Sequence, residues 1–466
     1  MKLGVIVTTR GFFNPKLAEA GRADLLKTLN EISCEYIALA ARDTPFGAVE
    51  TMEHAEKCAK LFRENHEEIG GILISLPNFG DEAATIAAVA GSGLRVPILV
   101  HAADDDKDRM DISNRRDAFC GKISVCNNLR QFGFKFTNTT YHTSDTESGV
   151  FKEDLRNFMK ICEVYRNLNS AKIAQIGTRP AAFRTVRFSE KLLQKSGITI
   201  IPADVLEIKG RADSISDQAA LDGWMRKTRG YGQICYKNDS AVLASAKLTM
   251  ALDGWMRENG CAAGAFQCWD AIQKYYGCGS CLSMSMLGEE GIPMACETDV
   301  MGAVAMYALY LASGQPSAYL DWNNSYGEDR DQCIVFHCGN FPKSFLGIEK
   351  PEISELDILG ATLGYDNCFG AVKGQIRSGG MTFANLITDD ENGRIRAYVG
   401  EGEFTDQKVE TVGAPGVCRI PNLQDLMKYI CGNGFSHHIA MNKSKTASVL
   451  TEVFGNYMGW DLYRHR

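Results

Sequence analysis

The chain has 466 residues, of which 45% are hydrophobic and 23% charged, so it is a globular sequence too long for a single core and two to four domains are expected. The net charge of −7 and the absence of long basic runs argue against a general nucleic-acid-binding surface. No apolar stretch approaches the roughly 18 residues of a membrane span, and the N-terminus lacks a small-residue cleavage site, so we expect neither a membrane helix nor a signal peptide.

The cysteines are numerous but scattered. There are 16, without the dense spacing of a small disulfide-rich secreted domain, so we expect reduced thiols and a cytoplasmic protein. Cys278 and Cys281 form a CxxC pair. A zinc site would need a second pair at a regular spacing, and a thioredoxin-like redox role would need a different context, so the pattern favours neither.

Residues 1–168 alternate apolar strand patterns with helical spacing. The predicted strands are residues 2–8, 36–41, 71–75 and 97–101, and the predicted helices are residues 16–32, 50–67 and 82–91. This rhythm predicts a flavodoxin-like parallel α/β domain. Arg10 follows the first strand, where a loop-tip cation could meet an anionic ligand.

A second parallel α/β domain is predicted over residues 169–320. Its first strand, residues 171–176, precedes Gly177-Thr178-Arg179-Pro180, a loop that could hold an anion or in which Arg179 could simply anchor its own loop. The loop matches neither a P-loop nor GxGxxG. The heptapeptide ALDGWMR occurs twice, ending at Arg226 and Arg257, and we expect both copies to be helical.

Residues 291–321, GIPMACETDVMGAVAMYALYLASGQPSAYLD, are the most informative segment. They read as strand, helix and strand, and each strand is followed by a carboxylate, Glu297 and Asp321. A right-handed crossover would lay the strands parallel and bring both acids to one sheet edge, as metal ligands or as an acid/base pair. The alternative for each acid is a helix-capping role, which Asp299 suits better.

Residues 321–466 predict a β-rich, antiparallel, barrel-like C-terminal domain, with a hairpin around Asn392-Gly393. Of the eight histidines, His337, His437 and His438 are the candidates left for a site after those on predicted surface helices, in the tail or of ambiguous placement are set aside. Two carboxylates and a late histidine suit Mn²⁺ or Mg²⁺, although a His-His pair taken alone is more often structural than metal-binding.

The chain resembles the L-fucose isomerase and L-arabinose isomerase superfamily, and most closely its fucose-isomerase-like branch, over nearly its whole length. The resemblance is carried by the segment from Gly291 to Asp321, together with FQCW at 266–269, CLSMSML at 281–287 and FHCG at 336–339. It implies Glu297 and Asp321 as metal ligands and acid/base pair, and His438, or failing that His437, as the third ligand. It further implies substrate contact by His337, with Trp269 and His437 as additional substrate-binding candidates. Arg10 and Arg179 are substrate-binding candidates because their positions at loop tips suit an anionic sugar.

The implied activity is that of a metal-dependent aldose–ketose isomerase with Mn²⁺, or alternatively Mg²⁺ or Co²⁺, that acts on a neutral, deoxy, acidic or sulfonated sugar through an enediol. The resemblance also implies a homo-oligomer, a trimer or hexamer, whereas the negative net charge leads us to expect no nucleic-acid partner. A non-catalytic sugar-binding or regulatory protein is the alternative, and a redox enzyme that uses Cys278 and Cys281 is a third.

Overall fold

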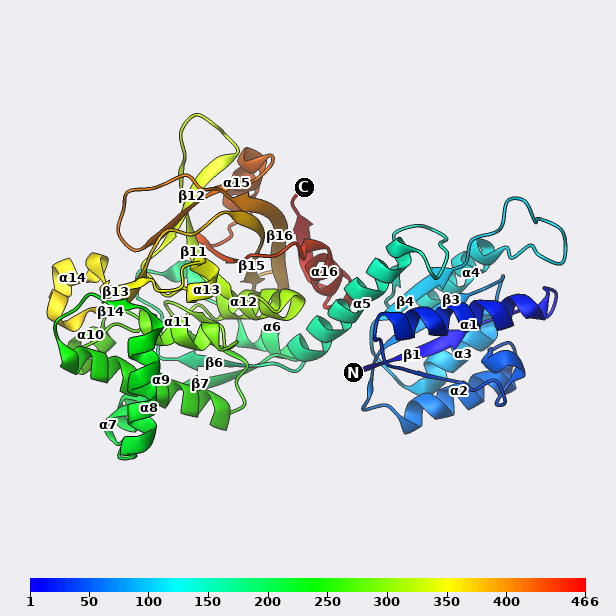
Figure 1. Ribbon diagram of the computed structural model, residues 1–466, viewed down its shortest axis with the longest axis horizontal. Helices are drawn as coiled ribbons and strands as arrows, with labels where there is room; N and C mark the ends of the chain where they lie inside the picture. Colours follow the sequence, from blue (N-terminus) through cyan, green and yellow to red (C-terminus); the bar gives the residue numbers. More distant parts are fainter. The chain divides into compact units, whose positions relative to one another are not determined.

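The structure is a computed structural model that describes all residues 1–466. Its contacts divide the chain into two compact units, residues 1–166 and residues 167–466 (Figure 1). The further predicted boundary near residue 320 stays a prediction.

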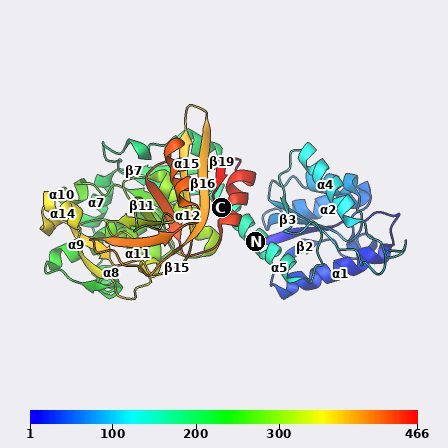
Figure 2. The ribbon, with the colours of Figure 1, turned by 90° about the horizontal axis from the view of Figure 1, so that it is seen from above.

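Unit 1 alternates strands and helices along the chain: β1 (Lys2–Val7), α1 (Pro15–Glu31), β2 (Tyr36–Ala38), η1 (Pro45–Gly47), α2 (Met52–Glu64), β3 (Ile69–Leu76), α3 (Glu82–Ser92), β4 (Ile98–Ala102), α4 (Ala118–Gln131), β5 (Thr137–Asn138) and α5 (Gly149–Leu168). All strands are parallel, in the order β2-β1-β3-β4-β5. Helices α1 and α5 cover one face, and α2, α3 and α4 cover the other (Figure 2). The strand order is that of the flavodoxin-like fold, so the predicted α/β class is confirmed here.

The first part of unit 2 is also α/β and contains β6 (Lys172–Ile176), η2 (Arg184–Val186), α6 (Glu190–Lys195), β7 (Thr199–Ala203), α7 (Val205–Asp213), α8 (Gln218–Tyr231), β8 (Gln233–Ile234), α9 (Asp239–Glu258), β9 (Ala263–Phe266), α10 (Ala271–Tyr276), α11 (Cys281–Glu289), β10 (Met294–Ala295) and α12 (Val300–Ser313). Its sheet is parallel, in the order β10-β9-β6-β7. Both copies of ALDGWMR are helical, in α8 and α9, as predicted.

The remainder of unit 2 is rich in strands: β11 (Ser317–Ser325), β12 (Gln332–His337), α13 (Lys343–Leu346), β13 (Glu352–Glu355), α14 (Asp357–Leu363), η3 (Tyr365–Asn367), β14 (Phe369–Lys373), β15 (Gly379–Asp389), β16 (Arg394–Phe404), β17 (Ala414–Arg419), α15 (Leu423–Gly432), β18 (His438–Asn442), α16 (Ala447–Thr451), η4 (Glu452–Tyr457) and β19 (Asp461–Arg464). Strands β15-β18-β11-β12-β17-β16 pair antiparallel in that order, and the β15–β16 hairpin closes the ring. The predicted hairpin and the barrel-like character are therefore confirmed. Strand β19 adds to β16 in parallel, and β14, β13 and β8 form a small separate sheet.

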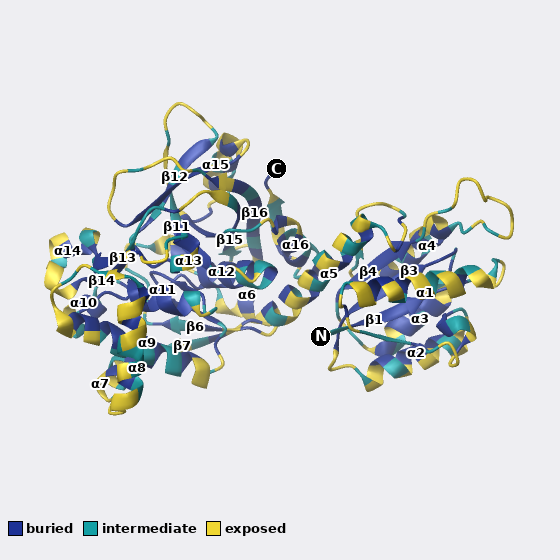
Figure 3. Ribbon diagram, in the orientation of Figure 1, coloured by how far each residue is buried: buried dark blue, intermediate teal, exposed yellow.

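Helix α12 connects the parallel sheet to the barrel. It contacts β9 and β10 on one side and β11, β15 and β18 on the other, and nearly all of its residues are buried (Figure 3). A helix that is apolar all round can be stable only in such an environment. Gly314, with φ of 68°, ends it, as the sequence predicts.

The predicted parallel pairing across this helix is wrong. Strand β10 pairs with β9 in the parallel sheet, whereas β11 lies in the barrel between β12 and β18, antiparallel to both. The segment is strand, helix and strand, but its two strands belong to different sheets. Glu297 and Asp321 therefore lie at the ends of strands from two different sheets and not along one sheet edge.

None of the helices combines the length and the apolar character that a membrane span requires.

Candidate functional site

Glu297 lies in a tight turn between β10 and α12. Glu297 and Thr298 both have left-handed backbones, with φ of 61° and 57°. Residues other than glycine rarely adopt this backbone conformation, because it costs on the order of 1–3 kcal/mol per residue. Such strained residues are commonly found at functional sites. The Thr298 amide donates to Phe266 O at 3.2 Å and the Asp299 amide to Cys296 O at 3.1 Å. These bonds hold the Glu297 carboxylate in a buried position.

Asp321 and His438 are direct cross-strand partners. They are paired in the register of β11 and β18, so both side chains project from the same face of the barrel wall. His438 Nε2 lies 3.5 Å from Asp321 Oδ1 and 2.9 Å from Glu297 Oε2. One imidazole nitrogen thus faces both carboxylates.

The three facing atoms lack hydrogen-bond partners. Glu297 Oε2, Asp321 Oδ1 and His438 Nε2 are buried, and none has a hydrogen bond of acceptable geometry, even across the 2.9 Å contact. Buried polar atoms are ordinarily paired, because leaving one unpaired costs about 1–3 kcal/mol. Two carboxylate oxygens and one imidazole nitrogen are a donor set that suits a divalent cation such as Mn²⁺. The residues present therefore fit the metal ion that the sequence implies.

The charges around His438 also favour a bound cation. Burial alone would lower the pKa of its imidazole, but the carboxylates of Asp299 and Glu297 outweigh burial and raise the pKa to about 10. The pocket is therefore strongly electronegative, and without a metal ion a proton on the imidazole would balance part of this charge. A bound divalent cation would take the place of that proton.

Asp299 orients the histidine. Its Oδ2 lies 3.0 Å from His438 Nδ1 and also accepts the Tyr319 hydroxyl, while its Oδ1 caps α12 by accepting from the Gly302 amide at 2.9 Å. A carboxylate on Nδ1 keeps the proton there and leaves the Nε2 lone pair free for a metal ion. The predicted capping role is confirmed. The orienting role was missed, because nothing in the local pattern indicates the contact with residue 438.

His337 lies at the end of β12, buried, with a ligand atom within 4.8 Å of ligand atoms of Glu297 and His438. Its Nδ1 accepts the Cys338 amide at 2.9 Å. An accepting Nδ1 places the proton of the neutral ring on Nε2, which then offers a donor and not a ligand lone pair. This hydrogen bond favours substrate contact over metal ligation for His337.

His437 precedes β18 and is exposed, with its Nε2 3.7 Å from Asp321 Oδ1. Its Nε2 is more distant from Asp321 than that of His438. Burial and the neighbouring His438 lower the pKa of His437, so the ring is predominantly neutral at neutral pH. This arrangement favours His438 as the ligand and leaves His437 at the mouth of the site.

An aromatic residue that the sequence analysis missed covers the site. Phe183, in the loop after β6, lies 5.2 Å from the Trp269 ring and 5.7 Å from the His437 ring, centroid to centroid. Gln267 ties this loop to the end of β9, because its Oε1 accepts the Thr178 amide at 2.9 Å. Trp269 thus stands at the site together with Phe183. No sequence motif marks Phe183, and only the loop geometry reveals it.

The two arginines of the sequence analysis are placed differently. Arg179 Nη1 donates to Pro180 O at 3.1 Å and to Ala181 O at 3.2 Å, so part of its guanidinium anchors its own loop. Arg10 lies in unit 1, with its guanidinium 4.5 Å above the Phe79 ring. A substrate contact by Arg10 stays a prediction.

The cysteines are all free, and Cys278 and Cys281 are both buried. The CxxC pair belongs to none of the clusters with metal-ligand spacing. Burial raises the pKa of the Cys278 thiol to about 12, which leaves it protonated and poorly nucleophilic at neutral pH. A redox role for the pair has no support in this geometry.

Comparison with known proteins agrees with the resemblance. The family model for the fucose/sulfoquinovose isomerase N-terminal domain matches residues 4–169, and that for the L-fucose isomerase C-terminal domain matches residues 335–465. A sulfoquinovose isomerase from Clostridium sp. (strain MSTE9) is 28% identical over 228 residues, which is 48% of this chain and 50% of the relative. A sulfoquinovose isomerase from Alkalicoccus urumqiensis is 21% identical over 365 residues, 77% of this chain and 78% of the relative.

A sulfoquinovose isomerase from Priestia megaterium (strain ATCC 12872 / QMB1551) is 24% identical over 230 residues and is matched over 50% of its length. The chain thus spans about half the length of two of these three relatives and over three quarters of the third. The two domain models lie at opposite ends of the chain, and the longest of these matches covers most of the sequence. On these grounds the chain belongs to the fucose-isomerase-like family.

Proposed function

We propose that the protein is a divalent-metal-dependent aldose–ketose isomerase that acts on a monosaccharide or sugar derivative. One observation carries this proposal: His438 Nε2 lies 2.9 Å from Glu297 Oε2 and 3.5 Å from Asp321 Oδ1, and all three buried atoms lack hydrogen-bond partners. His438 also belongs to two groups with metal-ligand spacing, one with Glu297 and one with Asp321. Glu297, Asp321 and His438 would hold the ion. A pure sugar-binding protein has no need of such a donor set.

The chemistry follows from these residues. A divalent ion held by these residues would supply a Lewis acid for the substrate carbonyl. Transfer of the proton from the adjacent carbon to a carboxylate generates the enediol. Glu297 and Asp321 share the acid and base roles, one on each of the two neighbouring carbons. Phe183 and Trp269 exclude water from the reacting end of the sugar.

We extend the proposal to the metal, substrate and assembly. Mn²⁺ is the proposed ion, with Mg²⁺ or Co²⁺ as substitutes, because carboxylate and imidazole donors suit these cations. The named relatives act on sulfoquinovose, a sugar that carries a sulfonate, and we propose a substrate of this class. A homo-oligomer, a trimer or hexamer, follows from the family resemblance, and free thiols throughout are consistent with a cytoplasmic protein.

The test is removal and return of the metal. Chelator-treated protein should bind Mn²⁺ in calorimetry, and Mn²⁺ should restore aldose-to-ketose conversion. Glu297→Gln should abolish both, whereas Glu258→Gln, on the surface of α9, should change neither. Turnover by Glu297→Gln at a rate near that of the wild type would overturn the assignment, and Mn²⁺ binding without turnover of any sugar would favour the sugar-binding alternative.

A further inference from the structure

A cavity of unit 2 reaches the turn that carries Glu297. It has a volume of about 920 Å³ and is lined by Thr298, by the loop between β6 and α6, and by the tip of the β15–β16 hairpin. Thr298 directly follows Glu297, so the cavity opens beside one of the proposed metal ligands. A sugar held by its carbonyl end at the metal would extend its other end into this space.

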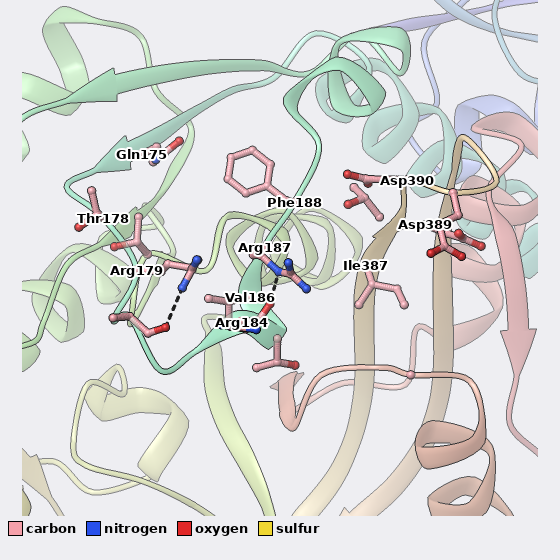
Figure 4. A pocket seen from close by; sticks show the side chains of 16 residues that line it. Gln175, Thr178, Arg179, Arg184, Val186, Arg187, Phe188, Ile387, Asp389 and Asp390 are labelled. Atoms are coloured by element: carbon pink, nitrogen blue, oxygen red, sulfur yellow. Dashed lines mark hydrogen bonds between the residues drawn. The ribbon is translucent and has the colours of Figure 1, made fainter.

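The loop side of the cavity is cationic. Figure 4 shows Arg179, Arg184 and Arg187 on this side and Asp389 and Asp390 on the hairpin side. Arg184 and Arg187 form no ion pair within the chain, and Arg187 Nε donates to Arg184 O at 2.9 Å, which leaves both of its Nη groups available. Two neighbouring guanidinium groups without counter-charges form a site for an oxyanion.

Three acids, Asp389, Asp390 and Glu391, line the opposite side of the cavity. Asp389 accepts from Arg394 Nε at 3.1 Å and from the Asn392 side chain, and Asp390 is exposed in the hairpin turn. Glu391 is likewise exposed, and none of the three acids forms an ion pair with the loop arginines. The guanidinium groups of Arg184 and Arg187 therefore remain available to an anionic ligand.

The loop also positions these arginines next to the proposed metal site. Phe183, whose ring contacts Trp269 and His437, immediately precedes Arg184. Consecutive Cα atoms lie about 3.8 Å apart, so the Arg184 backbone is one residue away from the aromatic cover of the site. The same loop thus carries Phe183 beside the proposed metal site and Arg184 and Arg187 on the wall of the adjoining cavity.

We propose that Arg184 and Arg187 form the subsite that binds the terminal sulfonate of the sugar substrate and so determine its specificity. The inference rests on the proposed isomerase function and adds the residues that select the substrate. A sulfonate stays fully ionised at neutral pH and presents three oxygens, which suits two planar, permanently charged guanidinium groups. A neutral sugar would leave both arginines without an acceptor.

The variants are Arg184→Ala, Arg187→Ala and their combination, with Arg226→Ala as the control. Arg226 is an exposed arginine on α8, outside the cavity and without an ion pair. A combined Arg184→Lys/Arg187→Lys variant keeps the charge but loses the two-pronged geometry. Far-UV circular dichroism and thermal melting verify that each variant is folded.

The first measurement is binding to chelator-treated protein by calorimetry, which needs no turnover. The ligands are a 6-sulfonated hexose, a hexose 6-phosphate, a hexuronic acid and a neutral 6-deoxyhexose. The wild type should bind the sulfonated hexose most tightly. Each single alanine variant should weaken this binding about 10- to 100-fold, because charge-assisted hydrogen bonds to the sulfonate are lost. The lysine variant should retain part of the affinity.

The second measurement is kcat/KM for the same sugars with Mn²⁺. In the double alanine variant the ratio for sulfonated over neutral sugar should fall on the order of 100-fold or more, mainly through KM. An unchanged ratio would overturn the subsite, and a wild-type preference for the phosphate or the uronate would overturn the sulfonate assignment. If the sulfonated sugar binds only when both arginines are present but no sugar is converted, the isomerase function is refuted and the subsite is supported. If the sulfonated sugar is converted equally well without the arginines, the isomerase function is supported and the subsite is refuted.

Discussion

Replacing Asp299 by Asn tests whether the metal site depends on an oriented His438. The Asp299 carboxylate accepts from the Gly302 amide, the Tyr319 hydroxyl and His438 Nδ1. Asparagine retains one oxygen, which caps α12 about as well as aspartate, so loss of helix stability should be small. Its amide group would face His438 Nδ1 as a donor, push the ring proton to Nε2 and so remove the lone pair that the metal needs.

Loss of such a supporting contact typically lowers metal affinity about 10- to 100-fold, or roughly 1.4 to 2.7 kcal/mol. Calorimetric titration of chelator-treated protein with Mn²⁺ measures the metal affinity directly, and thermal melting measures any loss of stability from the altered N-cap of α12. The matched control is Asp217→Asn, which changes the N-cap of α8 and contacts no histidine. Mn²⁺ affinity within twofold of the wild type, or an equal loss in the control, would refute the orienting role.

Two further predictions concern stability. Burial lowers the pKa of His101 from 6.5 to about 4, so the unfolded chain binds the proton first; between these values acidification should remove up to roughly 3 kcal/mol of unfolding free energy. Urea denaturation at pH 7 and pH 4.5 should show a smaller loss of unfolding free energy in His101→Gln than in the wild type, and equal losses would contradict a lowered pKa of His101. The second prediction concerns glycines in helices. Gly302→Ala would place a Cβ 2.1 Å from the Tyr319 ring, so it should lower the unfolding free energy by about 1–3 kcal/mol and weaken Mn²⁺ binding. Gly254→Ala has open space around it in α9 and should raise the unfolding free energy by about 0.5–1 kcal/mol. Equal melting temperatures for the two glycine variants would show that the close approach to Tyr319 carries no constraint.

Much of the secondary structure could be predicted, because local patterns encode it. Helix α12 begins at the predicted cap Asp299 and ends at the predicted stop Gly314, and the β15–β16 hairpin turns at Asn392-Gly393. The sheet pairing of β11 could not be predicted in this way. Its partners β12 and β18 are selected by packing against residues distant in the sequence, and a strand–helix–strand pattern does not encode whether its strands meet.

The candidate site divides in the same way. The positions of Glu297 and Asp321 at strand ends could be read from spacing, and His438 from the resemblance. The roles of Asp299 beyond its cap, of Phe183 and of the unpaired Arg184 and Arg187 could not, because each depends on a contact between separate segments.

The sequence by itself determined the α/β and β-rich halves, the family and the two carboxylates, because periodicity, caps and motifs are local properties. Only the tertiary structure decided that the acids come from two different sheets, with α12 packed between them, and that His438 stands opposite Asp321 on the barrel wall. The physical reason is burial: α12 is apolar on every side and is stable only when covered on both, and this packing brings the turn at Glu297 against the barrel.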